Sequence, residues 1–184
     1  LRPEDPDPFG ARGFLHEVYV AARPGYTGRV TVPVLRDRVT GAIVNNESRE
    51  IMTMLDVDLA PLATRGESLA PPELRPRIEE VLDAIYAPIN DGVYRTGFAT
   101  TQSAYEDACR TLFAALDHWE GVLSRQRFLC GDRMTLADVA LFTTLYRFDP
   151  VYHGHFKCNL RRIQDYPALS GFVRDVYQTD GVRE

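Results

Sequence analysis

The sequence predicts a small α/β unit followed by an all-α domain. Two β-branched or apolar runs, 30–35 and 42–44, flank a turn-like segment at 37–41, and this pattern is typical of a β-hairpin. From about Glu73 onward, apolar residues recur at helical spacing. A strand pair followed by a series of helices is therefore predicted to form two separate domains.

The first domain is predicted to cover residues 1–60. It opens with a helix over 14–22, which ends at the breaker cluster Arg23-Pro24-Gly25. The hairpin follows, and a second helix is predicted after Ser48. The apolar positions expected on the two helices are Phe14, Leu15, Val18 and Ala22, and Ile51, Met52 and Leu55.

A linker is predicted over 61–72, where Pro61, Pro71 and Pro72 interrupt any helical period. The helical domain then covers 73–184, and Pro76 falls in the first turn of its first helix, where proline is tolerated. Its four apolar stripes are Ile78, Leu82, Ile85 and Ile89; Tyr105, Cys109, Leu112, Leu116, Trp119 and Leu123; Leu136, Ala140 and Thr143 or Thr144; and Phe172, Val176 and Tyr177.

Composition excludes several classes of protein. Hydrophobic residues make up 45% and charged residues 26%, which is ordinary for a globular protein, and the net charge of −5 gives no general attraction for nucleic acid or anionic lipid. No apolar run approaches the roughly 18 residues of a membrane span. Cys109, Cys130 and Cys158 form no paired framework, so we expect a cytoplasmic protein. Because the sequence opens at Leu1 rather than Met and shows no signal peptide, we expect further residues upstream.

Pro33 is unusual within a strand-like segment, because proline cannot donate to a β-ladder. One interpretation is an edge strand. The other is a cis bond between Val32 and Pro33, which would turn the backbone N–H and C=O of Val32 toward an extended peptide ligand.

Asn46-Glu47-Ser48 stands at a predicted strand-to-helix junction. A helix start offers free N–H groups that favour a carboxylate, Ser48 could add a hydroxyl donor, and Glu47 could hold an ammonium group. The alternative is a simple N-cap.

Thr135 and Asp138 predict a capping box, with the Asp138 carboxylate returning to the N–H of Thr135. We therefore expect Asp138 to serve folding rather than catalysis.

Four segments in this order, 28–35, 43–48, 90–100 and 147–158, resemble the glutathionyl-hydroquinone reductases, the Xi class of the glutathione transferase superfamily. The last two are long and unusual, and the resemblance covers nearly the whole chain from about residue 14. It implies an incomplete thioredoxin-like domain followed by an all-helical bundle.

The resemblance also implies an activity. Such enzymes reduce glutathionyl-hydroquinones to hydroquinones, with glutathione as co-substrate and no metal. The implied partners are glutathione and aromatic hydroquinone or quinone conjugates, with no nucleic acid and no membrane, and the implied assembly is a homodimer.

Site residues are implied position by position. Val32 and Pro33 would meet the cysteinyl backbone of glutathione, Glu47 and Ser48 its γ-glutamyl end. Tyr94 and Tyr152 would line the aromatic substrate pocket.

The family's nucleophile lies in a Cys-Pro-Trp segment that this sequence lacks, so no catalytic residue is expected within it and the nucleophilic Cys is expected upstream. The segment that carries the family's C-terminal tail is likewise expected beyond Glu184. The three cysteines present stand at no thioredoxin-type helix start. His153 and His155 have no evident third ligand, so no metal site is predicted.

Two alternatives stay open from the sequence. A conventional glutathione S-transferase would activate glutathione with a Tyr or Ser hydroxyl at the helix start upstream. A non-catalytic glutathione-binding or dimerisation module would need no nucleophile.

Overall fold

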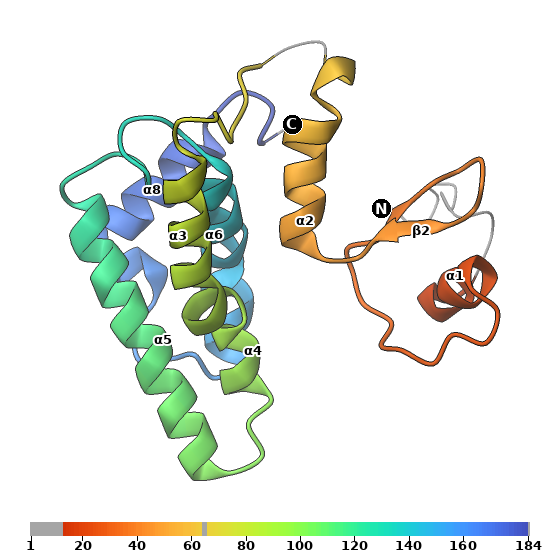
Figure 1. Ribbon diagram of the computed structural model, residues 1–184. Helices are drawn as coiled ribbons and strands as arrows, with labels where there is room; N and C mark the ends of the chain where they lie inside the picture. Colours follow the sequence, from red (N-terminus) through yellow and green to blue (C-terminus); the bar gives the residue numbers. More distant parts are fainter. Residues whose placement is uncertain (1–12, 64–65, 184) are drawn as a thin grey trace. The chain divides into compact units, whose positions relative to one another are not determined.

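The computed structural model describes residues 13–63 and 66–183, and the start of the chain at Leu1 lies outside them. The chain divides into two units, Leu1–Leu62 and Ala63–Glu184 (Figure 1). The first contains a small sheet, and the named elements among the described residues of the second are all helices.

The first unit combines short helices with a two-stranded antiparallel sheet. Its elements are α1 (Leu15–Ala22), β1 (Leu35–Arg36), β2 (Ile43–Asn45), α2 (Ser48–Thr53), the π-helix η1 (Met54–Asp58) and the 3₁₀-helix η2 (Ala60–Leu62). Leu35 pairs with Asn45 and Arg36 with Ile43, with a register irregularity between the two pairs. The predicted hairpin is thus present.

The hairpin turn is held by Asp37, whose carboxylate accepts hydrogen bonds from the backbone N–H groups of Val39 (2.7 Å) and Thr40 (3.1 Å). Gly41 closes the turn with a φ of 77°, a conformation that glycine adopts without steric cost. These local bonds explain why the turn could be predicted from its residue types.

Three sequence expectations for this unit were wrong. Leu55, expected on the apolar face of the second helix, lies in η1 and is 54% exposed. The strand predicted over 30–35 is regular only from Leu35, because Pro33 has no N–H for a ladder. Phe14 is 68% exposed as the N-cap of α1, and the buried residues of that helix are Val18 and Tyr19.

The second unit is a bundle of helices of very different lengths. The long ones are α3 (Arg75–Ile85), α5 (Gln102–Leu123), α6 (Leu136–Arg147) and α8 (Pro167–Tyr177). Between them lie the π-helices η3 (Tyr86–Asn90) and η4 (Phe148–Tyr152), the short helices α4 (Gly92–Gly97) and α7 (His153–His155), and the 3₁₀-helix η5 (Ile163–Asp165).

The core of the bundle follows most of the predicted stripes. The α3–η3 stripe is buried as predicted, and on α5 every predicted position from Cys109 to Leu123 is buried, while Tyr105 is only partly covered. On α6, the fully buried positions include Ala137 and Leu141 rather than Ala140. On α8, Tyr177 is 39% exposed and Leu169 takes its place in the core.

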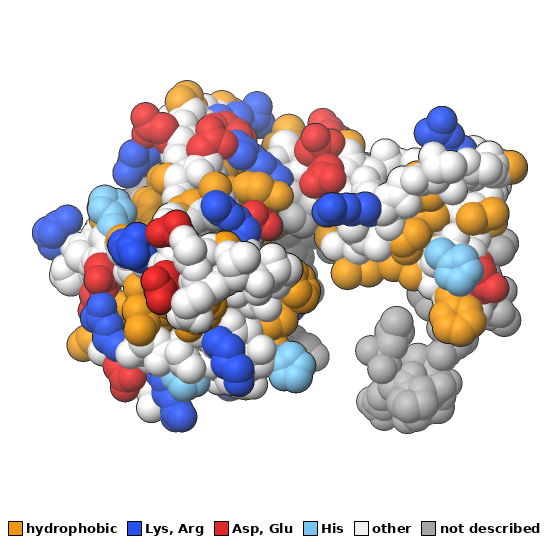
Figure 2. All heavy atoms as spheres, turned by 90° about the horizontal axis from the view of Figure 1, so that it is seen from below, with side chains coloured by type: hydrophobic (Ala, Val, Ile, Leu, Met, Phe, Trp, Pro, Cys, Tyr) orange, Lys and Arg blue, Asp and Glu red, His pale blue; other side chains and the backbone are white. Residues whose placement is uncertain are grey.

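Surface charge on the helical unit is mixed. Figure 2 shows Lys and Arg side chains interspersed with Asp and Glu on the face in view.

Within the described residues, no helix has both the length and the apolar character to cross a membrane.

Candidate functional site

The first group of candidate residues lies on the loop before β1. The Val32–Pro33 bond is cis, so the cis interpretation holds and the edge-strand interpretation does not. Val32 is 75% exposed, which leaves its backbone and side chain accessible.

Tyr19 holds this loop in place from α1. Its hydroxyl donates to the backbone oxygen of Thr31 (2.7 Å) and accepts from Nδ2 of Asn46 (3.2 Å). The same Asn46 amide donates to Oγ1 of Thr31 (3.1 Å). Thr31 and Asn46 are therefore bridged, and the residues that follow them, Val32 and Glu47, are brought into the same region of the unit.

Glu47 and Ser48 form the entrance of α2. Glu47 is the N-cap, with extended backbone and no capping bond from its side chain, and Ser48 is the first helical residue. The backbone N–H of Glu47 donates to Oδ1 of Asn45 (2.7 Å), which fixes the junction with β2. Because Glu47 and Ser48 are both exposed, their side chains remain available to a ligand.

The second group lies in the helical unit, where Tyr94 on α4 and Tyr152 at the end of η4 meet. Their hydroxyl oxygens are 3.2 Å apart and their rings make an edge contact at 5.7 Å. Both residues lie at or just after a π-helical turn, η3 or η4, and such turns are frequent at functional sites.

Two phenylalanines complete an aromatic cluster that the sequence did not single out. Phe156 lies 5.4 Å from the rings of both Tyr94 and Tyr152, and Phe98 lies 5.2 Å from Phe156. Phe98 is 69% exposed while Tyr152 is 4% exposed, so the cluster runs from surface to core. The spacing of Tyr94 and Phe98, four residues apart across the end of α4, was the available signal.

Burial, followed by the hydrogen bond with Tyr94, raises the pKa of Tyr152 to about 12. The Tyr152 phenol is therefore protonated at neutral pH and can donate a hydrogen bond.

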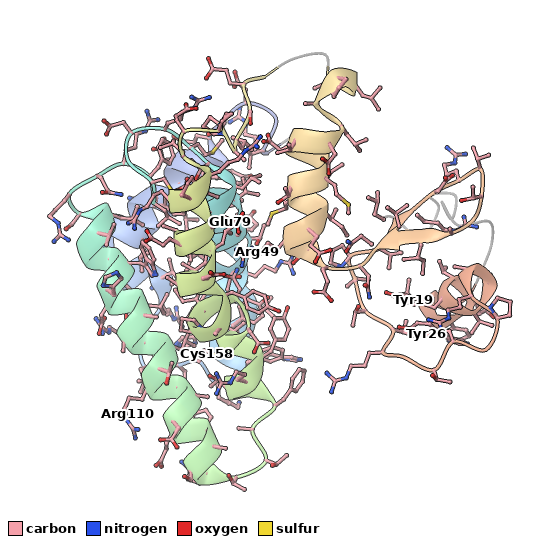
Figure 3. The ribbon with its side chains drawn as sticks, in the orientation of Figure 1. Tyr19, Tyr26, Arg49, Glu79, Arg110 and Cys158 are labelled. Carbon is pink, nitrogen blue, oxygen red and sulfur yellow. The ribbon has the colours of Figure 1, made fainter. Side chains whose placement is uncertain are left out.

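None of the three cysteines has the environment of a reactive thiolate. Burial raises the pKa of Cys158 to about 12 and also raises the pKa of Cys109 and of Cys130. Cys158 is completely buried within the helical unit, where Figure 3 labels it. All three are free thiols.

Among the described residues, no group of three or more His, Cys, Asp or Glu side chains could hold a metal ion. His153 is partly covered and His155 exposed, both on α7.

Comparisons with known proteins show which proteins this chain is similar to. A family model described as glutathione S-transferase, C-terminal domain, matches residues 102–175. Glutathionyl-hydroquinone reductase PcpF of Sphingobium chlorophenolicum is 51% identical over 168 residues, which are 91% of this chain and 54% of that protein. The solved structure of the Xi-class glutathione transferase of Natrialba magadii superimposes with a TM-score of 0.93 at 49% identity, covering 96% of this chain and 54% of that one.

In sequence and in fold, the chain matches the Xi class of glutathione transferases.

The glutathione-bound structure of YqjG from Escherichia coli superimposes with a TM-score of 0.93 at 44% identity, covering all of this chain and 60% of that one. The small sheet and the helical bundle agree with the predicted fold class, a partial thioredoxin-like domain followed by an all-α domain. The chain spans about half the length of the curated relatives it matches.

Proposed function

We propose that the protein containing this chain reduces glutathionyl-hydroquinones to hydroquinones, with glutathione as co-substrate. Two relatives at 51% and 47% identity, PcpF and YqjG, carry the name glutathionyl-hydroquinone reductase. The structural observation that carries the proposal is the aromatic cluster with two phenol hydroxyls 3.2 Å apart, because an aromatic diol fits rings by stacking and phenols by hydrogen bonding.

The reaction has two steps. A cysteine thiolate attacks the sulfur of the conjugate, so that a disulfide to the glutathionyl group forms, the carbon–sulfur bond breaks, and the aromatic carbon takes up a proton to leave as hydroquinone. The thiolate of a second glutathione then attacks this mixed disulfide, which frees the cysteine and yields glutathione disulfide. The aromatic carbon gains two electrons, and the two glutathione sulfurs lose one electron each.

The nucleophile in this proposal lies outside these 184 residues. The raised pKa of Cys109, Cys130 and Cys158 supports this assignment, since nucleophilic attack needs a thiolate near neutral pH.

Glutathione is proposed to bind along the loop at Val32 and Pro33, with its γ-glutamyl end held by Glu47 and Ser48. The exposure of Val32, Glu47 and Ser48 and the bridge between Thr31 and Asn46 support this placement. Tyr94 and Tyr152 are proposed to contact the aromatic ring. The domains are proposed as 1–60 and 73–184 joined by a linker at 61–72.

A cytoplasmic homodimer is part of the proposal. It rests on the resemblance to Xi-class enzymes and on the free thiols, which suit a reducing compartment.

The decisive experiment incubates the full-length protein with a glutathionyl-hydroquinone and glutathione, and measures the products by chromatography. We expect hydroquinone and glutathione disulfide in equal amounts. Conjugation of glutathione to an electrophile without disulfide would indicate a conventional transferase instead. Glutathione binding without either reaction would indicate a non-catalytic module.

A further inference from the structure

Tyr19 occupies a position that neither the sequence motifs nor the proposed reaction accounts for. Its side chain is 2% exposed, yet its hydroxyl has three polar partners. Besides the Thr31 oxygen and the Asn46 amide, it accepts a long hydrogen bond of 3.4 Å from the backbone N–H of Thr31. A buried phenol with these partners has a fixed orientation.

The partners of Tyr19 precede the two ligand-facing segments directly. Thr31 is followed by Val32, and Asn46 is followed by Glu47. The Asn46 amide also donates to Oγ1 of Thr31 at 3.1 Å, so the three residues form one closed set of contacts. A shift of the Tyr19 hydroxyl would therefore move the segment of Val32 relative to the start of α2.

We propose that Tyr19 is a positioning residue that sets the spacing between the two halves of the glutathione site. This inference rests on the proposed function. Tyr19 touches no reacting atom. Its hydroxyl pre-organises the loop at Val32 and the helix start at Glu47, so that a tripeptide spanning both finds them at the right separation.

The ring of Tyr19 makes a packing contact, whereas its hydroxyl makes the polar contacts described above. The ring packs against Tyr26 at a centroid distance of 5.0 Å, and both tyrosines are labelled in Figure 3. Tyr26 donates its own hydroxyl to the backbone oxygen of Arg29 at 2.7 Å, on the same loop but further from Val32. Tyr26→Phe therefore makes the same chemical change beside Tyr19 without touching the bridge.

The test measures glutathione affinity by calorimetry in the full-length protein, together with kcat at saturating glutathione and the thermal unfolding midpoint. Tyr19→Phe keeps the ring, and we expect it to weaken glutathione binding by about tenfold while kcat at saturation stays within about twofold. Tyr26→Phe should leave the affinity within about twofold of the unmodified protein. Asn46→Ala, which removes the bridging amide from a partly exposed position, should weaken glutathione binding in the same way. If Tyr19→Phe does not fold, the glutathione affinity of Asn46→Ala tests the proposed bridge instead.

Because Tyr19 and Asn46 act through one set of contacts, the double variant Tyr19→Phe/Asn46→Ala should bind glutathione about as weakly as the weaker single variant. Additive losses would overturn the inference. So would unchanged affinity in Tyr19→Phe, or a fall in kcat and in the unfolding midpoint without a change in affinity.

Glu47→Ala separates failure of this inference from failure of the proposed site. If Glu47→Ala loses glutathione affinity and Tyr19→Phe keeps it, the site stands and the role of Tyr19 is wrong. If the unmodified protein does not bind glutathione, the site and the inference both fall.

Discussion

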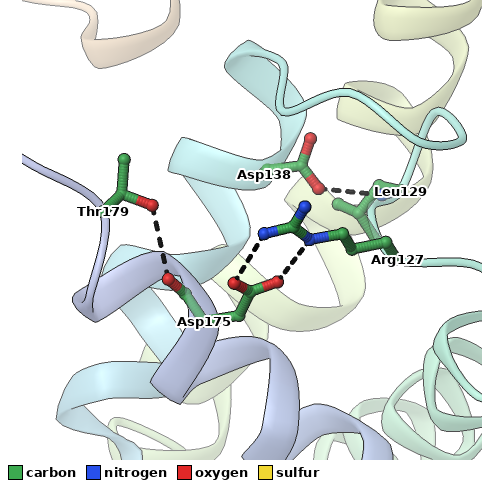
Figure 4. A network of polar contacts seen from close by, with 5 residues as sticks. All are labelled: Arg127, Leu129, Asp138, Asp175 and Thr179. Atoms are coloured by element: carbon green, nitrogen blue, oxygen red, sulfur yellow. Dashed lines mark hydrogen bonds and ion pairs between the residues drawn. The ribbon is translucent and has the colours of Figure 1, made fainter.

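At the scale of single residues, Asp138 shows how much one buried carboxylate can organise. Its oxygens accept hydrogen bonds from the N–H and the hydroxyl of Thr135, both at 2.8 Å, and from the N–H of Leu129, also at 2.8 Å. The first of these belongs to the capping box of α6 that the sequence predicts. The hydrogen bond to Leu129, drawn in Figure 4, anchors the preceding loop. No local sequence pattern predicts this bond.

Asp138→Ala should lower the free energy of unfolding by about 2–4 kcal/mol, since it removes a helix cap and leaves the buried N–H of Leu129 without an acceptor. Urea denaturation followed by circular dichroism would measure this loss. A change below about 0.5 kcal/mol, the scale of ordinary surface substitutions, would contradict the assignment of Asp138 to stability.

The same carboxyl should give a measurable pH dependence. Burial raises the pKa of Asp138 above its ordinary value, against the opposing effect of its hydrogen-bond donors. A group whose pKa is raised on folding contributes stability that is present at low pH and lost as the pH rises through the folded pKa. The stability advantage of the unmodified protein over Asp138→Asn should therefore be larger at pH 4 than at pH 7, and an advantage that grows with pH would contradict the direction of the shift.

At the scale of elements, a carboxylate from one helix accepts hydrogen bonds from the first turn of another. Glu120 of α5 accepts hydrogen bonds from the N–H groups of Ala168 (2.9 Å) and Leu169 (2.8 Å) in the first turn of α8. A negative charge is favourable at a helix N-terminus, and these groups have no partner within the helix itself. The sequence placed α8 correctly from its apolar residues, but the partner of its first turn lies 48 residues away.

A second contact between elements shapes the aromatic cluster. A Cβ atom at Gly97, the last residue of α4, would lie 2.4 Å from Cγ of Phe156. Glycine at this position allows the Phe156 ring to reach Tyr94 and Tyr152, so the cluster depends on a missing side chain as well as on those present.

Gly97→Ala should force Phe156 out of its position, with a cost of about 1–3 kcal/mol in the free energy of unfolding and a higher KM for the aromatic conjugate. Gly121→Ala is a matched control, because Gly121 lies in α5 with no heavy atom within 4 Å of the added Cβ. It should instead stabilise the protein by roughly 0.5–1 kcal/mol. Equal effects of the two substitutions in denaturation and kinetics would show that Phe156 does not constrain position 97.

At the scale of the whole molecule, the two units have different kinds of stabilisation. The helical unit has a continuous core, from Ile78 on α3 to Val176 on α8, and ion pairs at its surface such as Arg127 with Asp175, whose two bonds of 2.8 and 2.9 Å appear in Figure 4. The first unit buries few side chains among its described residues, and its order depends more on polar contacts such as those of Tyr19.

The thiols provide a test that covers the whole helical unit. Because burial raises the pKa of Cys109, Cys130 and Cys158, each should react slowly with iodoacetamide at pH 7.5 and rapidly once guanidinium chloride unfolds the protein. Peptide mapping by mass spectrometry resolves the three sites. Rapid labelling of any one of them in the folded protein would identify a reactive thiol inside this chain and would contradict the placement of the nucleophile elsewhere.

The order of elements, the hairpin turn, most of the helical core and the capping box were predictable from the sequence, because each depends on residues within a few positions of one another. The sequence also pointed to a cis bond at Pro33 as one of two alternatives. It misplaced Phe14, Ala140 and Tyr177, whose burial depends on which neighbouring element covers each helix face.

Contacts between segments that are distant in the chain could not be predicted from the sequence and are seen only in the folded protein. The approach of Phe156 to Gly97 and the bridge from Tyr19 to Thr31 and Asn46 join residues that no periodicity relates. Backbone hydrogen bonding and amphipathic spacing are local properties of a chain, whereas the position of a polar or aromatic side chain depends on how whole elements pack.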